Sequence, residues 1–219
     1  MEAAIQEPIV APGQKRPMRL FVLGATGRTG VEIIDLALAR GHSVTGFVRS
    51  PAKIERRHER LALVRGDPRR ADEIVPALRR HDAVVSALGP RQVFKTTTLL
   101  RDCAASTVEA MRAAGVKRIL LVSQALLFPG GGPLYAAGRF FLRLPILDST
   151  EMERIVMASS LEWTIARPPR LIHRREEKYR ARADAMPDGL VISWRALAAF
   201  LLDAAERGEH VRKIVGLSR

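Results

Sequence analysis

Three glycines of this chain stand at the spacing of a diphosphate-binding loop. They belong to the run GATGRTG at residues 24–30, which directly follows the apolar run RLFVL and precedes a stretch with helical periodicity. In a strand–loop–helix unit, the first glycine permits the tight turn, the second lets the backbone approach a diphosphate, and the third lets the helix pack closely. An ordinary flexible turn is the alternative, but the order of the elements favours a dinucleotide site. Its predicted binding residues are Gly24, Thr26, Gly27, Arg28, Thr29 and Gly30.

A second signal lies about 20 residues further on, where sites that prefer NAD carry an acid that binds the ribose hydroxyls. This chain has Arg49 there, followed by Lys53. A guanidinium can bind a 2′-phosphate through two parallel hydrogen bonds, whereas a carboxylate would repel it. The sequence therefore predicts NADP as cofactor, with NADPH preferred over NADH. The alternative is that Arg49 is one of many surface arginines.

Composition limits the class of protein. The chain has 219 residues, 47% of them apolar, a net charge of +13 and a single cysteine, Cys103. One globular domain is expected, without a disulfide or a cysteine-based zinc site, and with a cytoplasmic location. The histidines show no metal-ligand spacing, so no metal is expected. The basic residues are spread along the chain with few aromatics between them, which argues against nucleic acid as a partner. No apolar run is long enough to span a membrane.

Short apolar runs alternate with longer amphipathic stretches from Met18 to the C-terminus, after a tail (1–17) expected to be flexible. This alternation predicts an α/β fold with a doubly wound parallel sheet, a Rossmann fold in one domain (18–219). In such a sheet the ligand lies at the carboxyl ends of the strands. The expected strands are 19–23, 43–48, 61–64, 83–87, 118–123, 163–166 and 213–217, and the expected helices are 29–40, 71–80, 97–114, one from Ser149 or Thr150, and 194–207.

Two segments are predicted to cap a substrate, near 129–148 and 170–189. The apolar part 134–147 contains two arginines; it is expected to pack in the core or an interface, with a lid or a membrane-surface helix as alternatives. Thr150 and Glu153 have the spacing of a capping box, which predicts that a helix begins there. The basic stretch 167–182 would steer an anionic substrate, or would simply be solvated.

Several further motifs resemble one family. The chain resembles the atypical short-chain dehydrogenases/reductases with an NAD(P)H-binding Rossmann domain at six places. These are the loop at 24–30, the turn 48–51, Gly66-Asp67, Ser86 to Gly89, Leu121 to Ser123 and the run LEWTIARPP at 161–169. Within that family the chain most resembles the flavin reductase/biliverdin-IXβ reductase group. The resemblance covers nearly everything from Met18 onward, and its motifs are more specific for fold and cofactor than for substrate.

The resemblance implies roles for residues at the ends of later strands. Asp67 would border the adenine, and Gly89 and Arg91 would follow the cofactor. Ser123 would lie near the nicotinamide, and Pro168 near the substrate mouth. The residues themselves leave alternatives open. Asp67 could simply form a turn before Pro68, and Ser123 could cap the end of a strand. The residues predicted to border the acceptor and assist catalysis are Ser123 and Arg170.

Short-chain dehydrogenases usually protonate the substrate with a tyrosine, assisted by a lysine four residues later. Tyr135 and Arg139 have this spacing, but arginine cannot act as a titrating relay. Counting back from Arg167 places the position of the catalytic tyrosine near Pro145 and that of its lysine near Ser149. We therefore interpret Tyr135 as part of an inserted segment. In the flavin reductase group, as the resemblance implies, hydride passes directly to an electron-poor conjugated ring and solvent supplies the proton.

The expected function is therefore an NADPH-dependent reductase of a flavin-like, tetrapyrrole or quinone acceptor, with no prediction of oligomeric state. Two alternatives remain. One is a non-catalytic NADP(H) sensor that acts on a protein partner, since similar domains can lose the tyrosine–lysine pair. The other is an NAD(P)-dependent epimerase or reductase that uses Tyr135 as proton donor.

Overall fold

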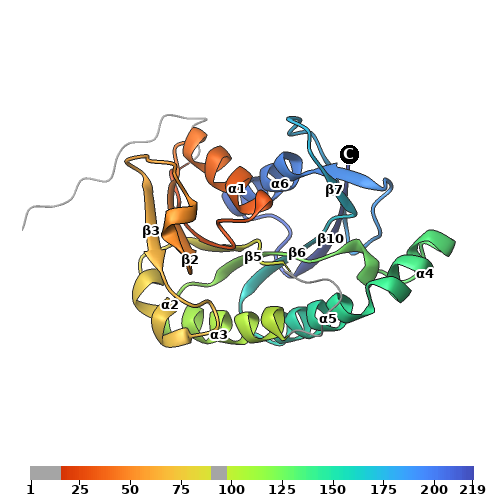
Figure 1. The fold of residues 1–219 in the computed structure, drawn as a ribbon, viewed down its shortest axis with the longest axis horizontal. Helices are drawn as coiled ribbons and strands as arrows, with labels where there is room; N and C mark the ends of the chain where they lie inside the picture. Colours follow the sequence, from red (N-terminus) through yellow and green to blue (C-terminus); the bar gives the residue numbers. More distant parts are fainter. Residues whose placement is uncertain (1–15, 90–97) are drawn as a thin grey trace, which may run out of the picture.

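A computed structural model describes residues 16–89 and 98–219, and its centre is a twisted eight-stranded sheet (Figure 1). The strand order is β3-β2-β1-β4-β5-β6-β10-β8, with every neighbouring pair parallel except β10 and β8. The strands are β1 (Arg19–Leu23), β2 (Ser43–Val48), β3 (Leu61–Arg65), β4 (Ala83–Ser86), β5 (Arg118–Val122), β6 (Glu162–Arg167), β8 (Arg180–Ala183) and β10 (Lys213–Ser218). Two further strands, β7 (Arg170–Ile172) and β9 (Val191–Ser193), pair in parallel as a separate small sheet.

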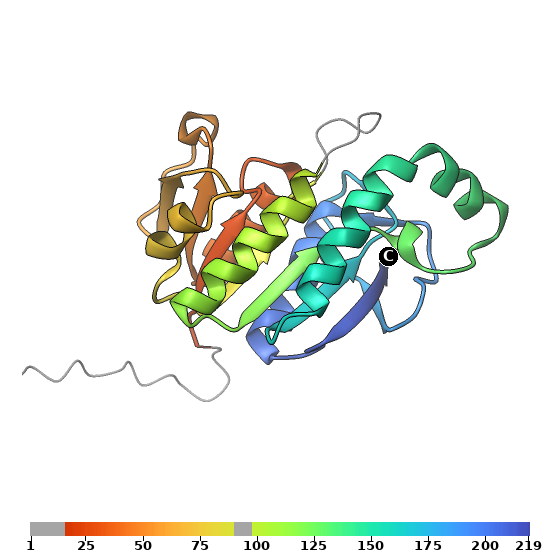
Figure 2. The ribbon, with the colours of Figure 1, turned by 90° about the horizontal axis from the view of Figure 1, so that it is seen from below.

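Helices cover both faces of the large sheet, as Figures 1 and 2 show. On one face lie α1 (Arg28–Ala39) and α6 (Trp194–Arg207), which pack against each other. On the other face α3 (Leu99–Ala114) lies between α2 (Ala71–Leu78) and α5 (Arg143–Met157). The remaining α-helix of the described residues, α4 (Gly132–Phe141), projects beyond the sheet. The short helical turns are η1 (Pro51–Lys53) and η2 (Ala125–Leu127).

The sheet is apolar on both sides because successive side chains of a strand point to opposite faces. In β1, Leu20 and Val22 join the core beneath α1 and α6, whereas Phe21 and Leu23 join the core beneath α2, α3 and α5. All four side chains are fully buried. This two-sided burial explains the near-continuous apolar strands in the sequence and confirms the doubly wound α/β fold.

The strand order reverses at β1, whose neighbours are β2 on one side and β4 on the other. In open parallel sheets, a crevice for ligands forms at the carboxyl ends of the strands beside this reversal. The loop 24–30 follows β1 at this point, and Gly89 lies shortly after the end of β4, the strand next to β1. Arg91 and residues 1–15 of the predicted tail lie outside the described residues.

The helix predicted to begin at Ser149 or Thr150 is longer than predicted, because α5 already begins at Arg143. The capping-box prediction is wrong: Thr150 lies inside this helix, and its Oγ1 donates to the carbonyl of Ile146 at 2.8 Å. Pro145 hid the true start of α5, although proline is tolerated in a first turn, where the backbone N–H has no intrahelical partner. The segment 134–147 thus forms most of α4 and the start of α5. Part of the basic stretch forms β7 and β8.

Candidate functional site

The glycine loop packs so closely that side chains would not fit at two of its positions. Gly24 has φ +78°, and a Cβ there would lie 2.6 Å from the carbonyl oxygen of Ala87. A Cβ on Gly30 would overlap the carbonyl oxygen of Gly24. The amide of Gly27 donates to that same oxygen at 2.9 Å and closes the turn. The loop therefore brings the start of α1 against the ends of β1 and β4.

The N-terminus of α1 has the character of an anion site. Its N-cap, Gly27, provides no side-chain hydrogen bond, and the first turn contains no acidic residue. Thr29 and Gly30 are buried, whereas Thr26 and Arg28 are exposed. The Arg28 guanidinium carbon lies 5.0 Å from the centre of the Trp194 ring, at the start of α6. The positive end of the helix dipole and a neighbouring arginine thus face the same region.

Arg49 directly follows β2, and Lys53 ends η1; both side chains are exposed. Asp67 follows β3, the strand paired with β2. Its pKa is lowered, first by hydrogen bonds from Arg69 and to a smaller extent by the positive charge of Arg49. Arg49 therefore acts electrostatically on the next strand end, where the fold is expected to hold the adenosine part of a dinucleotide.

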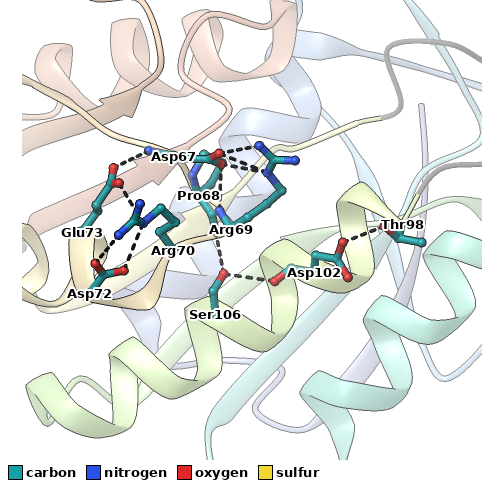
Figure 3. A network of polar contacts seen from close by, with 9 residues as sticks. All are labelled: Asp67, Pro68, Arg69, Arg70, Asp72, Glu73, Thr98, Asp102 and Ser106. Carbon is teal, nitrogen blue, oxygen red and sulfur yellow. Dashed lines mark hydrogen bonds and ion pairs between the residues drawn. The ribbon is translucent and has the colours of Figure 1, made fainter.

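Asp67 is the centre of a polar network between β3 and α3 (Figure 3). Its carboxylate accepts bonds from Nε and Nη2 of Arg69, and its amide donates to Glu73 at 2.8 Å. Its backbone carbonyl also accepts from the amide of Arg70, as in a turn. Asp67 thus acts as a turn residue, and its role toward adenine stays a prediction. Sequence reasoning missed Arg69, although its position two residues after Asp67 was a signal.

Ser123 lies just beyond β5, and its amide donates to the carbonyl of Ala166 in β6 at 2.8 Å. Its hydroxyl oxygen is buried and has no hydrogen-bond partner within residues 16–89 and 98–219. A buried hydroxyl without a partner is costly, so native structures seldom contain one unless something else satisfies it. The hydroxyl therefore does not cap the strand within that part of the chain.

A cavity of about 630 Å³ opens beside the ends of β5 and β6. It brings together Tyr135, Pro168 and Arg170, three of the residues singled out in the sequence. Its volume lies in the usual range for small-molecule sites. The lining is mostly apolar and consists of Gln124, Ala125, Leu126, Leu134, Tyr135, Gly138, Leu142, Pro168, Pro169, Arg170, Leu190 and Val191.

The two positions that correspond to a tyrosine and a lysine hold no proton donor of that kind. The Ser149 hydroxyl donates to the carbonyl of Pro145 at 2.8 Å, and Nε2 of Gln124 donates to the Ser149 oxygen at 2.9 Å. Burial raises the pKa of Tyr135. Arg139 donates to the carbonyls of Phe128 and Gly130. Arg139 is thus engaged by backbone carbonyls, and the part that Tyr135 plays stays a prediction. Sequence reasoning missed Gln124, although it directly follows Ser123.

A buried ion pair supports the floor of the cavity. Arg167, at the end of β6, donates from Nε to Glu153 of α5 at 3.0 Å, and both residues are buried. Its guanidinium also lies 4.6 Å from the ring centre of Phe128. Because Arg167 precedes Pro168 and Pro169, the pair holds in place the backbone from which these two lining residues extend.

The reversal of strand order, the three-glycine loop and the uncapped start of α1 together define an NAD(P)-binding Rossmann-fold protein. The chain belongs to the NAD(P)H-binding family, whose model matches residues 24–207. Solved structures of a short-chain dehydrogenase/reductase from Veillonella parvula and of a putative epimerase from Bacteroides thetaiotaomicron share the fold, at 19% and 23% identity. The finer assignment to the flavin reductase/biliverdin-IXβ reductase group stays a prediction.

Individual relatives are distant. A 3-diazoavenalumate denitrifying reductase of Streptomyces sp. is 31% identical, over 68% of this chain and 55% of the relative. The photosystem II assembly factor Ycf39 of Synechocystis is 28% identical, over 68% of this chain and 43% of the relative. A Rossmann-fold NAD(P)-binding family protein from Shigella flexneri has 25% identity and a TM-score of 0.75, over 93% of this chain and 94% of that one. The chain spans about half the length of the first two.

Proposed function

We propose that this chain is an NADPH-dependent reductase that transfers a hydride to a conjugated acceptor. The observation that carries the proposal is the apolar cavity beside β5 and β6, whose lining includes Gln124, the residue that follows Ser123. The buried Ser123 hydroxyl itself lacks a partner among the described residues. In a Rossmann fold, the reactive end of the cofactor lies at these strand ends. The Streptomyces relative, itself named a reductase, supports the same class of reaction.

The cofactor would be held by the loop and by three positive side chains. The amides at the start of α1 would bind the diphosphate, with Thr26 and Arg28 at its edge. Arg49 and Lys53 would bind the 2′-phosphate, which favours NADPH over NADH. Asp67, held in place by Arg69, would border the adenine.

The reactive end would lie between Gly89 and Ser123. When bound, the reduced nicotinamide supplies the hydride, and the Ser123 hydroxyl orients the group that it contacts. Pro168 and the apolar cavity wall would hold the acceptor ring against it and exclude water. Arg170, at the cavity, would bind an anionic substituent of the acceptor. One hydride and one solvent proton complete the reduction of an acceptor such as a flavin, a tetrapyrrole or a quinone.

The test is oxidation of NADPH by the purified protein with a panel of FMN, biliverdin and an uncharged quinone. We expect turnover with at least one acceptor, and a kcat at least about tenfold lower for Ser123→Ala, because a misaligned acceptor loses rate. Arg170→Gln should raise KM for the anionic acceptors and leave the quinone unaffected. Tyr135→Phe should leave the rate unchanged. Loss of activity in Tyr135→Phe would instead support the epimerase or reductase that uses this tyrosine.

A second candidate is a non-catalytic NADP(H) sensor that acts on a protein partner. Two observations favour it: Pro145 and Ser149 stand where a proton donor and its lysine are expected, and the Synechocystis relative is named an assembly factor. Tight binding of NADP and NADPH, with different affinities and without turnover on the panel, would favour the sensor over the reductase.

A further inference from the structure

The outward side of α4 is apolar, although it faces solvent. Phe140 and Phe141 are 68% and 69% exposed, and Leu147 at the start of α5 is 62% exposed. Leu134, which also lines the cavity, is 64% exposed at the edge of this side. Ala136 and Ala137 are exposed between them. Spacings of three, four and seven residues place the side chains of α4 on one side of the helix. This segment was predicted to pack in the core or an interface; these side chains lie outside the core, and packing in an interface stays a prediction.

The opposite side of α4 already has its partners. Tyr135 is buried in a small cluster with Ala125 and Phe128, and the same side of the helix lines the cavity. Rotating Phe140 and Phe141 inward would expose Tyr135. Contiguous apolar surface on a folded domain marks a binding surface, and none of the described residues covers the outward side of α4.

Charge indicates what that partner is. From Gln124 to Leu147 the chain contains no acidic residue, and Arg143 is exposed between Phe141 and Leu147. Arg139 is instead engaged by the carbonyls of residues 128 and 130. The whole chain carries a net charge of +13. A symmetric pair of copies joined through this side would bring the arginines of both copies together, which like-charge repulsion disfavours. An apolar face flanked by arginine is instead the pattern of a helix that lies in the headgroup region of an anionic bilayer.

We propose that the outward side of α4 and the first turn of α5 bind the surface of a membrane that contains anionic lipids. Phe140 and Phe141 enter the boundary between headgroups and acyl chains, and Arg143 meets the lipid phosphates. No helix among the described residues could cross a bilayer, so the attachment is peripheral. Because the other side of α4 lines the cavity, binding brings the cavity close to the lipid. The proposal does not depend on which acceptor is reduced.

The test is co-sedimentation of the full chain with vesicles of phosphatidylcholine, alone or mixed with phosphatidylglycerol. We expect partition onto the mixed vesicles only, and weaker partition at high salt. The double variant Phe140→Ser/Phe141→Ser should lose at least about tenfold in partition, because it removes two large apolar side chains from the lipid boundary. Val211→Ser, which changes an exposed apolar residue remote from α4, should bind as wild type does.

A second variant tests whether a loss of vesicle binding reflects a folding defect. Phe141→Trp should show a blue-shifted emission on the mixed vesicles and quenching by brominated lipid, and every variant should keep the wild-type affinity for NADPH in solution. The proposal is overturned if wild type does not partition, or if the double serine variant partitions equally well, which would leave only non-specific attraction of a basic protein. A dimer that the double variant dissociates, without vesicle binding, would assign the surface to a second copy.

Discussion

At the scale of single residues, the proposed preference for NADPH depends on the charge at the end of β2. Arg49 is exposed, follows β2 directly and acts electrostatically on the Asp67 carboxyl. The carboxylate of Asp67 is itself engaged by Arg69. The local field that a 2′-phosphate would meet is therefore set mainly by Arg49 and Lys53.

Arg49→Gln should weaken NADPH binding by about 1–3 kcal/mol, which is the usual range for a hydrogen bond to a charged group, and should leave NADH almost unchanged. Isothermal titration with both cofactors measures the difference. Arg112→Gln, which changes an exposed arginine in the last turn of α3, is the matched control and should affect neither. An equal loss for NADPH and NADH would defeat the role assigned to Arg49.

Cys103 provides a second prediction. Burial raises the pKa of its thiol to about 12. Only about one molecule in 10⁴ then carries the reactive thiolate at pH 8. An aromatic disulfide reagent should therefore react slowly with the native protein and rapidly after denaturation. Fast stoichiometric labelling of the native state would contradict this environment for Cys103.

His81 predicts a pH dependence of stability. Burial lowers its pKa; Nδ1–H donates to the carbonyl of Leu78, and Nε2 accepts from the hydroxyl of Thr45 at 2.8 Å. The folded state therefore takes up this proton at lower pH than the unfolded state, whose pKa is about 6.5. The contribution of His81 to the free energy of unfolding is therefore fully present above about pH 6.5. It is lost as the pH falls toward the lower pKa of the folded state.

Urea denaturation at several pH values should therefore show a free energy of unfolding that decreases below about pH 6.5. His81→Gln should be less stable near neutral pH and should have a shallower slope. His58→Gln, which keeps His81, should retain the wild-type slope. A wild-type slope in His81→Gln would assign the acid sensitivity to other groups.

At the scale of elements, a side chain from α5 caps α3. The carboxylate of Asp148 accepts from the amides of Leu100 at 3.1 Å and Arg101 at 3.0 Å, although it is separated from them by almost 50 residues. Asp148 is buried. The negative charge also stabilises the positive end of the α3 dipole. This contact joins the two helices beside the candidate site.

Asp148→Ala should lower the free energy of unfolding by about 1–3 kcal/mol, since it leaves the buried amide of Leu100 and the part-buried amide of Arg101 without their acceptor. Asp148→Asn retains an acceptor oxygen and should cost less. Thermal and urea denaturation measure both variants. Equal losses in Ala and Asn would show that the carboxylate charge, and not the hydrogen bonds, stabilises α3.

The sequence predicted the features that depend on local patterns. The glycine loop and the alternation of strands and helices are encoded in adjacent residues, and the fold follows from them. The start of α5 was missed because Pro145 interrupts an apolar run. Strand β8 was missed because arginine alternates with alanine on an exposed sheet edge, where burial leaves no pattern. The contact between Gln124 and Ser149 depends on tertiary packing, which no local spacing reveals.

At the scale of the whole molecule, a polar network joins the first crossover to the last. Nη1 of Arg40, after α1, donates to Asp203 at 2.7 Å and to Glu206 at 2.9 Å, both in α6. His42 contacts the same Glu206 oxygen, and Tyr179 donates to Asp203. The side chain of Glu206 is only 2% exposed, so its charge depends on these partners. The network therefore couples the two halves of the sheet.

Arg40→Gln should lower global stability by about 1–3 kcal/mol, because it removes one cation from a mostly buried carboxylate. Arg154→Gln, which breaks the exposed pair with Glu151, should cost less than about 1 kcal/mol. Urea denaturation followed by two spectroscopic probes measures both variants. If the two probes report the same transition in Arg40→Gln, the two halves of the sheet still unfold together. A loss of stability no larger than that of Arg154→Gln would contradict the coupling of the two halves through Arg40.

The antiparallel strand β8 has a consequence for the protein at high concentration. All four of its residues are exposed, and two of them, Arg180 and Arg182, are positively charged. A second molecule that approached this border to extend the hydrogen-bonded ladder would bring its own arginines against these. Charge repulsion therefore disfavours, at this border, the strand-to-strand stacking with which fibril growth begins.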